Sequence, residues 1–363
     1  MKDQLIFSPL NAWAPTHDRP LIISGPCGAE SFEQVHATAA GLAALKRVSI
    51  FRAGIWKPRT RPNAFEGVGE IGLEWLKTVK AEFGFLTTVE VANANHVALA
   101  LKHGVDILWI GARTTVNPFS VQEIADAVRG HDIPVMIKNP IHADLQLWVG
   151  AIERLHHAGI TKLAAIHRGF YSYKKDIYRN PPLWELPIEL KTIFPGLPII
   201  CDPSHICGNR ELLFSIGQKA MDLNFDGLMI ESHNNPAVAL SDKQQQLTPN
   251  ELNVLLDKLA VRHHHADPLA FSNQLQQLRT MVDNADEDLL LTLQARMALI
   301  NEIGYYKKTN NITVLQLERW LNILETRLSS GNKKALDQEF IGKLFHLIHQ
   351  ESIRIQTEIL NQQ

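Results

Sequence analysis

Residues 20–56 read PLIISGPCGAESFEQVHATAAGLAALKRVSIFRAGIW. Two apolar runs, PLIISGPCG and SIFRAGIW, enclose the segment SFEQVHATAAGLAAL, whose apolar spacing is typical of an amphipathic helix. Strands that are apolar almost throughout and are separated by helices are typical of a parallel sheet covered on its outer face. The stretch therefore predicts one strand, one covering helix and a second, parallel strand.

The same pattern recurs from residue 20 to about residue 260. The apolar runs are PLIISGPCG, SIFRAGIW, FLTTVEV, VDILWIGA, PVMIKNPI, KLAAIHRGF, LPIICDPSH and FDGLMIESH. Eight such units in about 240 residues fit a TIM (β/α)8 barrel better than an open doubly wound sheet. Gly67, Gly69 and Gly72 spell GxGxxG, but a dinucleotide site must follow a strand directly, and a basic loop intervenes here. We predict an α/β fold built on a TIM barrel.

After Ala260 the pattern changes to purely helical periodicity. Apolar residues recur at spacings of three and four, which predicts a long amphipathic helix over about 271–308 and shorter helices over about 314–329 and 337–360. An all-α three-helix domain of this kind cannot easily close a core alone, so we expect a homodimer or higher homo-oligomer formed through the helices. The predicted domains are a barrel over 1–260, a linker over 261–268 and a helical domain over 269–363.

Composition limits the class of protein. The 363 residues include 36 Lys and Arg against 38 Asp and Glu, so the chain is near neutral, and we expect no nucleic-acid partner. Cys27, Cys201 and Cys207 are an odd, sparse set that indicates a reducing compartment and no disulfide framework. Because no apolar run is long enough to span a bilayer, we expect a cytoplasmic protein without a membrane partner.

The segment FRAGIWKPRTRP, residues 51–62, holds four cations and no acid: Arg52, Lys57, Arg59 and Arg61. Arginine offers phosphate a rigid fork of donors and lysine offers a mobile point charge. A solvated basic loop is the alternative interpretation of such a run taken alone. The segment is therefore a candidate phosphate site, and its surroundings must distinguish that interpretation from a solvated loop.

In a TIM barrel the reactive groups collect at the carboxyl ends of the strands. The polar residues at those ends are Cys27, Arg52, Lys57, Glu90, Arg113, Lys138, Arg168, Asp202, His205 and Glu231, with Asp242 in the loop after the last run. One subset is cationic. The other offers a thiolate, an imidazole and two carboxylates, a set suited to a divalent metal such as Mn, Fe, Co or Zn: Cys27, His205, Glu231 and Asp242. His233 is a rival ligand, because residues 231 and 233 face the same side of a strand.

Eight short motifs resemble one enzyme family in order along the chain. They are GPCGAES (25–31), FRAGIWKPRT (51–60), IGART (110–114), IKNP (137–140), HRGF (167–170), DPSH (202–205), IESH (230–233) and SDKQQQL (241–247). Together they resemble the type I beta group of 3-deoxy-D-arabino-heptulosonate 7-phosphate (DAHP) synthase over about residues 18–260. That family condenses phosphoenolpyruvate with erythrose 4-phosphate.

The resemblance implies a role for each candidate residue. Cys27, His205, Glu231 and Asp242 would hold the metal that polarises the aldehyde. Phosphoenolpyruvate would be clamped by Arg113, Lys138 and Arg168, with Arg52 and Lys57 nearby. Lys57 is the candidate proton donor to the developing alkoxide, and Arg59 with Thr60 would bind the phosphate of erythrose 4-phosphate.

Three features test that resemblance. The related 3-deoxy-D-manno-octulosonate 8-phosphate synthases typically carry a KANR-like loop, whereas this chain has KPRT at 57–60 and keeps Cys27. Arg61 follows where the family more often has Ser, so its role stays open. The barrel pattern begins within about twenty residues, so we expect no N-terminal regulatory domain. A metal-free aldolase using Lys138 as a Schiff base is the alternative chemistry.

The helical tail resembles the AroQ class of chorismate mutase. The matching residues are Arg279, Arg296, Lys307, Arg319, Ser352 and Gln356. The resemblance implies rearrangement of chorismate to prephenate without a cofactor. The three arginines would fix the carboxylates, and Lys307 with Gln356 would stabilise the ether oxygen.

Spacing on the long helix separates two of these cations. Arg279 and Arg296 lie 17 residues apart, which is about 25 Å along a helix and about 100° around it, so they cannot hold one small dicarboxylate. If both are catalytic, Arg279 must reach the site of a second chain. Arg296 and Lys307 differ by 11 residues, return to nearly the same face and can flank one ligand.

Two positions depart from the mutase pattern. Trp320 stands where the family usually has Glu, and Gln316 stands where an acid is common. Glu318 can substitute for a lost polar contact. These departures keep a second hypothesis open, in which the tail is mainly a regulatory and dimerising module that binds chorismate or prephenate without useful turnover.

Overall fold

The computed structural model describes residues 5–15, 20–57, 65–174, 176–262 and 269–362. The chain divides into two compact units, residues 1–264 and 265–363. The predicted linker over 261–268 lies largely outside the described residues, so the predicted domain boundaries stay predictions. Among the described helices, none combines the length and the apolar character needed to cross a membrane.

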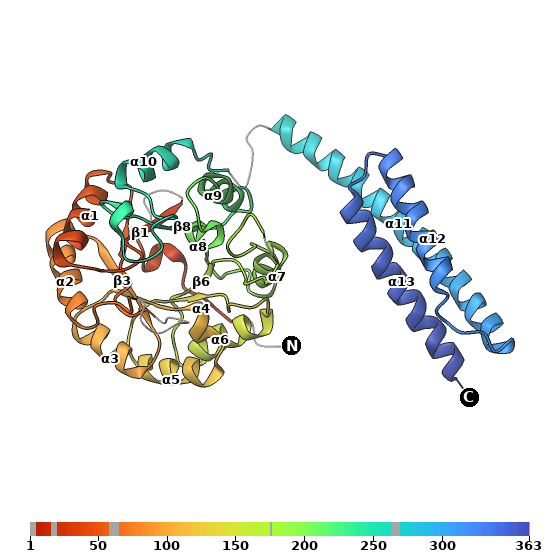
Figure 1. The fold of residues 1–363 in the computed structure, drawn as a ribbon, viewed down its shortest axis with the longest axis horizontal. Helices are drawn as coiled ribbons and strands as arrows, with labels where there is room; N and C mark the ends of the chain where they lie inside the picture. The colour runs from red at the N-terminus through yellow and green to blue at the C-terminus, as the bar shows by residue number, and fades with distance from the viewer. Residues whose placement is uncertain (1–4, 16–19, 58–64, 175, 263–268, 363) are drawn as a thin grey trace. The chain divides into compact units, whose positions relative to one another are not determined.

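The first unit is a closed barrel of parallel strands that pair in chain order (Figure 1). The strands are β1 (Leu21–Gly25), β2 (Ile50–Arg52), β3 (Leu86–Val91), β4 (Ile107–Ile110), β5 (Val135–Lys138), β6 (Leu163–His167), β7 (Ile199–Cys201) and β8 (Gly227–Glu231). Closure is set by β1, where Ile23 pairs with Ile50 of β2 and with Met229 of β8. The predicted TIM barrel is confirmed.

Helices surround the barrel (Figure 1). They are α1 (Phe32–Ala44), α2 (Ile71–Phe83), α3 (Ala94–Lys102), α5 (Pro118–Val128), α6 (Leu145–His157), α7 (Glu185–Ile193), α9 (Leu213–Asp222) and α10 (Pro249–Lys258). The short helices α4 (Ala112–Thr115) and α8 (Pro203–Cys207) directly follow the carboxyl ends of β4 and β7, and there are short 3-10 turns, η1 (Leu10–Ala12) and η2 (Pro236–Val238). Several begin at side chains that accept a hydrogen bond from the first turn, as Ser31 does from Gln34 and Asn93 does from His96. Each such cap fixes the point at which the loop from the carboxyl end of a strand enters the next helix.

Two apolar layers hold the barrel rigid. The interior is filled by large side chains from successive strands, including Ile50, Trp109, Met136, Ile166 and Met229. A second and larger cluster packs the outward-facing strand residues against the surrounding helices. A filled interior means that ligands can enter only at the ends of the strands.

The second unit consists of α11 (Leu269–Thr309), α12 (Leu317–Lys333) and α13 (Gln338–Asn361). The three predicted helices are confirmed, with ends that differ from the prediction by a few residues. The last helix, α13, packs against both others. Few apolar side chains of the unit are buried, with Ile341 and Ile359 of α13 among them.

Candidate functional site

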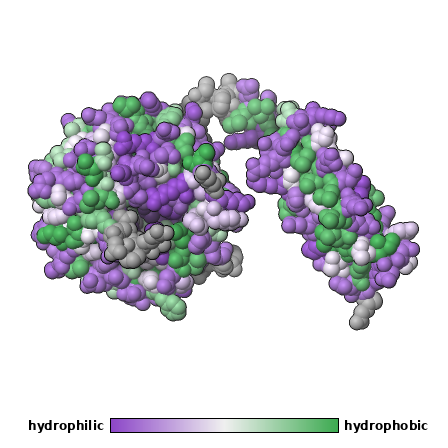
Figure 2. Space-filling view, viewed as in Figure 1, coloured by the Kyte–Doolittle hydropathy of each residue, from purple (hydrophilic) through white to green (hydrophobic). Residues whose placement is uncertain are grey.

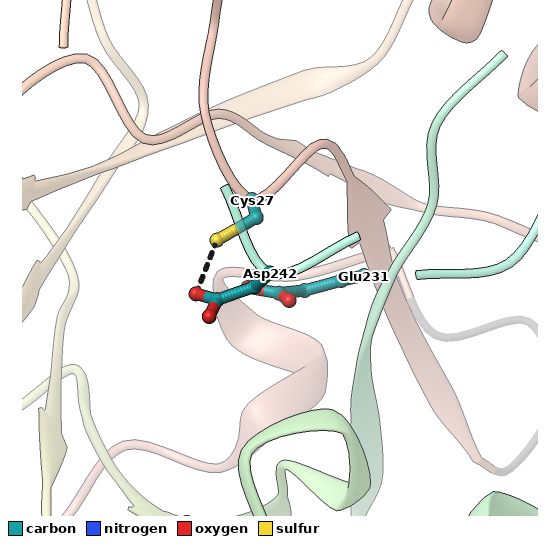
Figure 3. Close-up of side chains that lie close together, drawn as sticks. All are labelled: Cys27, Glu231 and Asp242. Carbon is teal, nitrogen blue, oxygen red and sulfur yellow. Dashed lines mark hydrogen bonds between the residues drawn. The ribbon is translucent and has the colours of Figure 1, made fainter. Parts of the chain in front are cut away.

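Three potential metal ligands meet at the carboxyl end of the barrel (Figure 3). Glu231 ends β8, and Gly25 at the end of β1 pairs with it, so Cys27 emerges beside that carboxylate. One donor atom from each of Cys27, Glu231 and Asp242 lies within 4.8 Å of the others. The Cys27 thiol donates to Asp242 Oδ2 at 3.1 Å. Pairing of the first and last strands thus builds the cluster from distant parts of the sequence.

The loop after β8 is bonded to this cluster at several points. Gln246 Oε1 accepts from the Cys27 backbone N–H at 2.9 Å, and Gln245 Nε2 donates to Glu231 Oε2 at 2.7 Å. Asp242 itself has a left-handed backbone, with φ of 50°. Aspartate tolerates that conformation better than most residues, and strained backbone is common where a function fixes a side chain.

Of the two candidate histidines, His205 lies next to Glu231 but outside the group of three ligands that are mutually close, and His233 is directed elsewhere. The α8 helix places His205 so that Nδ1 lies 2.8 Å from Asp202 Oδ2 and Nε2 lies 3.7 Å from Glu231 Oε1. The Asp202 carboxylate fixes the ring and leaves Nε2 directed toward the other candidate ligands. His233 instead accepts from the Asn235 backbone N–H and has its Nε2 3.7 Å from Glu30. His233 Nε2 therefore lies beside Glu30, and His233 is not one of the three grouped ligands.

Buried cations line the same end of the barrel. Arg52 Nη2 lies 3.3 Å from Glu231 Oε1, and Lys57 Nζ lies 2.9 Å from the Cys27 sulfur. Lys138 Nζ lies 2.8 Å from Asp202 Oδ2. Both Arg52 and Lys138 are buried, and Figure 2 shows hydrophilic residues gathered over the centre of the barrel. Buried charges of this kind need partners, and here each has a carboxylate or thiol neighbour.

Arg168 is the most strained of the cations electrostatically. Burial lowers its pKa to about 10, and the charges of Arg179 and Arg113 act in the same direction, although Asp202 opposes them. Three arginines thus repel one another at the rim. An anion bound between them would relieve that repulsion and raise the pKa of Arg168 toward its ordinary value.

Charge at the metal-ligand cluster is also imbalanced. Burial raises the pKa of the Cys27 thiol to about 12, and the Glu231 carboxylate adds to the effect while Lys57 opposes it. Burial alone would raise the pKa of Glu231, but the charges of His205 and Arg52 outweigh it and lower that pKa. The cluster therefore holds ionised carboxylates beside a thiol that needs a positive neighbour to lose its proton.

These residues fit a divalent metal. Glu231 Oε1 is buried and, within the described part of the chain, accepts no hydrogen bond. Arg52 Nη2 lies 3.3 Å from this oxygen and offers it charge without a hydrogen bond, so the oxygen keeps a lone pair for a metal ion. Sulfur, carboxylate oxygen and imidazole nitrogen together suit the borderline metals better than Mg or Ca.

Two residues near the cluster were not predicted from the sequence. Arg179 Nη1 donates to Asp242 Oδ1 at 2.8 Å and to Gln245 Oε1 at 3.0 Å. Gln245 lies within the SDKQQQL motif, and Arg179 lies in the loop after β6, which also opens at the carboxyl end. Examining every cation in those loops would have found Arg179. Of the predicted phosphate ligands, Arg59 and Thr60 lie outside the described residues, as does Arg61.

In the helical unit, three predicted residues meet between α11 and α13, and a fourth, Lys307, bonds to the connection after α11. Arg296 Nη1 donates to Ser352 Oγ at 2.7 Å, and Gln356 Nε2 donates to the Ser352 carbonyl at 3.1 Å. Lys307 is buried and donates to the Val314 carbonyl at 2.6 Å. A buried lysine that satisfies only a carbonyl leaves a positive charge without an acid beside it.

The other two predicted residues do not join that group within one chain. Arg279 is exposed on α11, 17 residues before Arg296, and Arg319 is exposed at the start of α12. Trp320, next to Arg319, stacks on His349 of α13 with ring centroids 3.9 Å apart. The single helical unit thus holds part of the predicted mutase site.

Fold and site together define a TIM-barrel enzyme with a cationic mouth and a metal-ligand cluster, joined to a separate helical unit. The profile of the DAHP synthetase I family matches residues 11–265, and that of chorismate mutase type II matches residues 278–357. The chain belongs to the DAHP synthetase I family and carries a chorismate mutase type II domain.

Curated relatives match the two units separately. A Thermotoga maritima phospho-2-dehydro-3-deoxyheptonate aldolase is 30% identical over 248 residues, covering 66% of this chain and 71% of that protein. A Helicobacter pylori 2-dehydro-3-deoxyphosphooctonate aldolase is 29% identical, covering 68% of this chain and 96% of that protein. A Buchnera aphidicola bifunctional chorismate mutase/prephenate dehydratase is 33% identical over 89 residues, 24% of this chain and 23% of that protein.

Solved structures agree on the barrel. The crystal structure of the Thermotoga maritima phospho-2-dehydro-3-deoxyheptonate aldolase (DAHP synthase) superposes with a TM-score of 0.60 at 29% identity, covering 66% of this chain and 68% of that chain. A truncated form of the Thermotoga maritima 3-deoxy-D-arabino-heptulosonate 7-phosphate synthase gives a TM-score of 0.58 at 27% identity.

Proposed function

We propose that the barrel catalyses a metal-dependent condensation of phosphoenolpyruvate with erythrose 4-phosphate, giving DAHP and phosphate. The observation that carries this proposal is the cluster of Cys27, Glu231 and Asp242 beside buried cations at one end of the barrel. The name of the Thermotoga relative supports the substrate pair. Three unpaired cysteines support a cytoplasmic location.

Each barrel residue has a proposed role. Cys27, His205, Glu231 and Asp242 hold the metal, which is Mn, Fe, Co or Zn. That metal supplies Lewis-acid polarisation of the sugar aldehyde. Phosphoenolpyruvate is bound by Arg113, Lys138 and Arg168, with Arg52 beside it, and the phosphate of erythrose 4-phosphate is bound by Arg59 and Thr60.

Lys57 is the proposed proton donor. Its ammonium lies 2.8 Å from the Cys27 carbonyl and 2.9 Å from the Cys27 sulfur, so it is held at the edge of the cluster. A protonated amine in that position can stabilise the negative charge that develops on the aldehyde oxygen. The mutual repulsion of two phosphorylated substrates is offset by the surrounding cations.

Phosphoenolpyruvate consumption tests the barrel proposal. Purified protein receives erythrose 4-phosphate with and without a chelator, and manganese is then restored. We expect the chelator to stop consumption and the metal to restore it. A five-carbon aldose phosphate serves as the comparison substrate, since the Helicobacter relative carries an octulosonate name. Consumption with the five-carbon sugar alone would overturn the substrate assignment.

We propose that the helical unit rearranges chorismate to prephenate. Arg296, Ser352 and Gln356 meet between α11 and α13, and Lys307 donates to the Val314 carbonyl. Within the part of the chain that the structure describes, none of these hydrogen bonds involves an acid. Arg296 and Arg319 fix the substrate carboxylates, and Lys307 with Gln356 stabilises the ether oxygen as charge develops. Gln356 Oε1 is buried and has no hydrogen-bond partner within the described residues.

The mutase proposal requires a second chain. Apolar side chains on the first half of α11 are exposed, with Leu278 at 53%, Val282 at 59% and Leu289 at 51%. Figure 2 shows hydrophobic residues along this unit. Two such helices packed together would bury these residues and bring Arg279 of one chain to Arg296 of the other. Replacing Leu278 and Val282 with Lys should give monomers on sedimentation and abolish mutase turnover.

A regulatory tail is the second candidate function. Trp320 stands where the mutase family usually has Glu, which favours a pocket that binds chorismate or prephenate without useful turnover. The variant Arg296→Ala separates the two. Loss of chorismate turnover supports catalysis, whereas unchanged turnover would show that Arg296 has no catalytic role.

A further inference from the structure

His349 lies in an unusual position on α13. Its ring stacks on Trp320 of α12, with centroids 3.9 Å apart and planes 7° from parallel, and the edge of His346 meets the same indole at 5.0 Å. His349 Nε2 is buried and has no hydrogen-bond partner within the described residues. A buried polar atom left alone costs free energy, so an atom held this way calls for a ligand.

The sequence places that atom beside the candidate mutase residues. Positions 349, 352 and 356 follow one another at helical spacing and face the same side of α13. Ser352 is bonded to Arg296, and Gln356 Oε1 is the other buried atom on this face without a partner. Two unpartnered polar atoms therefore flank the Arg296–Ser352 pair, one on each side.

Two cationic side chains and two rings lie near the His349 ring. The α11 helix contributes Arg296 and Lys307, α13 contributes His346, and α12 contributes the uncharged face of Trp320. Burial lowers the pKa of His349, and the charges of Arg296, His346 and Lys307 lower it further. The ring is therefore neutral near pH 7 while the site holds no anion.

An anion between Arg296 and Lys307 reverses that balance. It would neutralise the two charges that oppose protonation and would itself attract an imidazolium. The indole face of Trp320 stabilises a cation stacked on it.

We propose that His349 is a further ligand-binding residue of the helical site, whose Nε2 takes a proton from solvent when a dicarboxylate binds and donates a hydrogen bond to one of its carboxylates. The proposal rests on the proposed function, in which Arg296 and Lys307 hold chorismate or prephenate. No covalent bond forms or breaks, and the proton comes from the buffer.

Linkage fixes the sign of the pH dependence. If the complex holds a proton that the free site lacks, affinity rises as the pH falls through the interval between the two titrations of His349. Up to one proton is taken up per site, and affinity changes by at most about tenfold per pH unit. Ligand carboxylates stay ionised above about pH 6, so they contribute nothing to this uptake.

The test is calorimetric titration of the full chain with prephenate, in buffers of different ionisation enthalpy at pH 7. We expect the parent to take up a substantial fraction of one proton and to bind about tenfold more tightly at pH 6.5 than at pH 8. His349→Gln should take up no proton and change less than about twofold in affinity over that range. His346→Gln is the matched control and should keep the uptake, because Nε2 of His349 is unchanged.

Each other outcome has a definite meaning. Unaltered proton uptake in His349→Gln would overturn the proposal. Absence of prephenate binding to the parent would show that the proposed function of the helical site has failed, whatever His349 does. If His349→Gln unfolds, which circular dichroism would show, Trp320→Leu replaces it, and uptake unchanged by loss of the stacked indole overturns the proposal as well.

Discussion

At the scale of single residues, Arg179 shows how a side chain outside the predicted ligand set can control that set. One of its nitrogens bonds both Asp242 and Gln245, and Gln245 in turn donates to Glu231. Arg179 therefore orients two candidate metal ligands at once. Partners of this kind are worth a large part of the affinity of a metal site.

We predict that Arg179→Met weakens metal binding by about 10-fold to 100-fold, because Asp242 and Gln245 lose the donor that fixes them. Manganese affinity, measured by electron paramagnetic resonance on the full chain, checks this without relying on turnover. Arg129→Met is the matched control, since Arg129 is exposed and its guanidinium pairs with the exposed Asp126. Equal affinity in both variants would remove Arg179 from the metal site.

His167 gives a residue-scale prediction about acid stability. Burial lowers its pKa from 6.5 to about 3, and the neighbouring Arg168 charge acts in the same direction. The unfolded chain binds a proton near pH 6.5 and the folded chain does not, so the stability that is present above pH 6.5 is lost as the pH falls. Because of His167, the free energy of unfolding should fall by about 2 kcal/mol as the pH is lowered from 7 to 5.

Urea unfolding of the barrel at these two pH values measures the effect. His167→Phe should remove that part of the pH dependence, because Phe fits among Phe170, Trp184 and Phe225, which surround the ring. His131→Gln is the control at an exposed histidine and should keep the pH dependence of the parent. If the free energy of unfolding of His167→Phe depended on pH as strongly as that of the parent, other groups would be responsible for the effect.

At the scale of elements, the sequence was most informative where the signal is local. The apolar runs and the three-and-four spacing depend on neighbours in the chain, so the eight strands and the three long helices could be predicted. The contacts that complete the site are not local. Gln246 reaches Cys27 across 219 positions, and Arg179 reaches Asp242 across 63, so no pattern within one segment encodes them.

Gly304 supplies an element-scale prediction about how α11 meets α13. A Cβ at Gly304 would lie 2.7 Å from Ile359 Cδ1 and 3.5 Å from the Gln356 Cα, whereas a Cβ at Gly150 in α6 meets nothing within 4 Å. Both glycines are helical, so alanine should gain up to about 1 kcal/mol of stability at Gly150. At Gly304 the crowding should cancel that gain and displace Gln356.

Thermal unfolding and chorismate turnover check the two alanine variants. Gly150→Ala should raise the melting temperature of the barrel and leave mutase turnover unchanged. Gly304→Ala should lower turnover and fail to stabilise the helical unit. An equal gain in stability at both positions, with full turnover, would show that the packing of α11 against α13 does not require glycine at position 304.

At the scale of the whole molecule, each of the two units has buried apolar residues of its own. The barrel clusters comprise strand, helix and loop residues before position 260, whereas the buried apolar residues of the helical unit include Ile341 and Ile359. Each proposed active site likewise draws its described residues from one unit. Chemistry in one unit should therefore survive the loss of a ligand in the other.

Cys27→Ser tests that independence. Serine keeps the size of the side chain but offers a neutral hydroxyl in place of a thiolate, so metal affinity should fall by at least about 100-fold, and DAHP formation with it. Chorismate turnover should stay within about twofold of the parent, because the proposed mutase residues Arg296 and Lys307 belong to the other compact unit. The same preparation is assayed for both reactions, and its circular dichroism is compared with that of the parent. Loss of both activities in a well-folded variant would mean that the barrel site and the helical site are coupled through a conformational equilibrium that both sites bias.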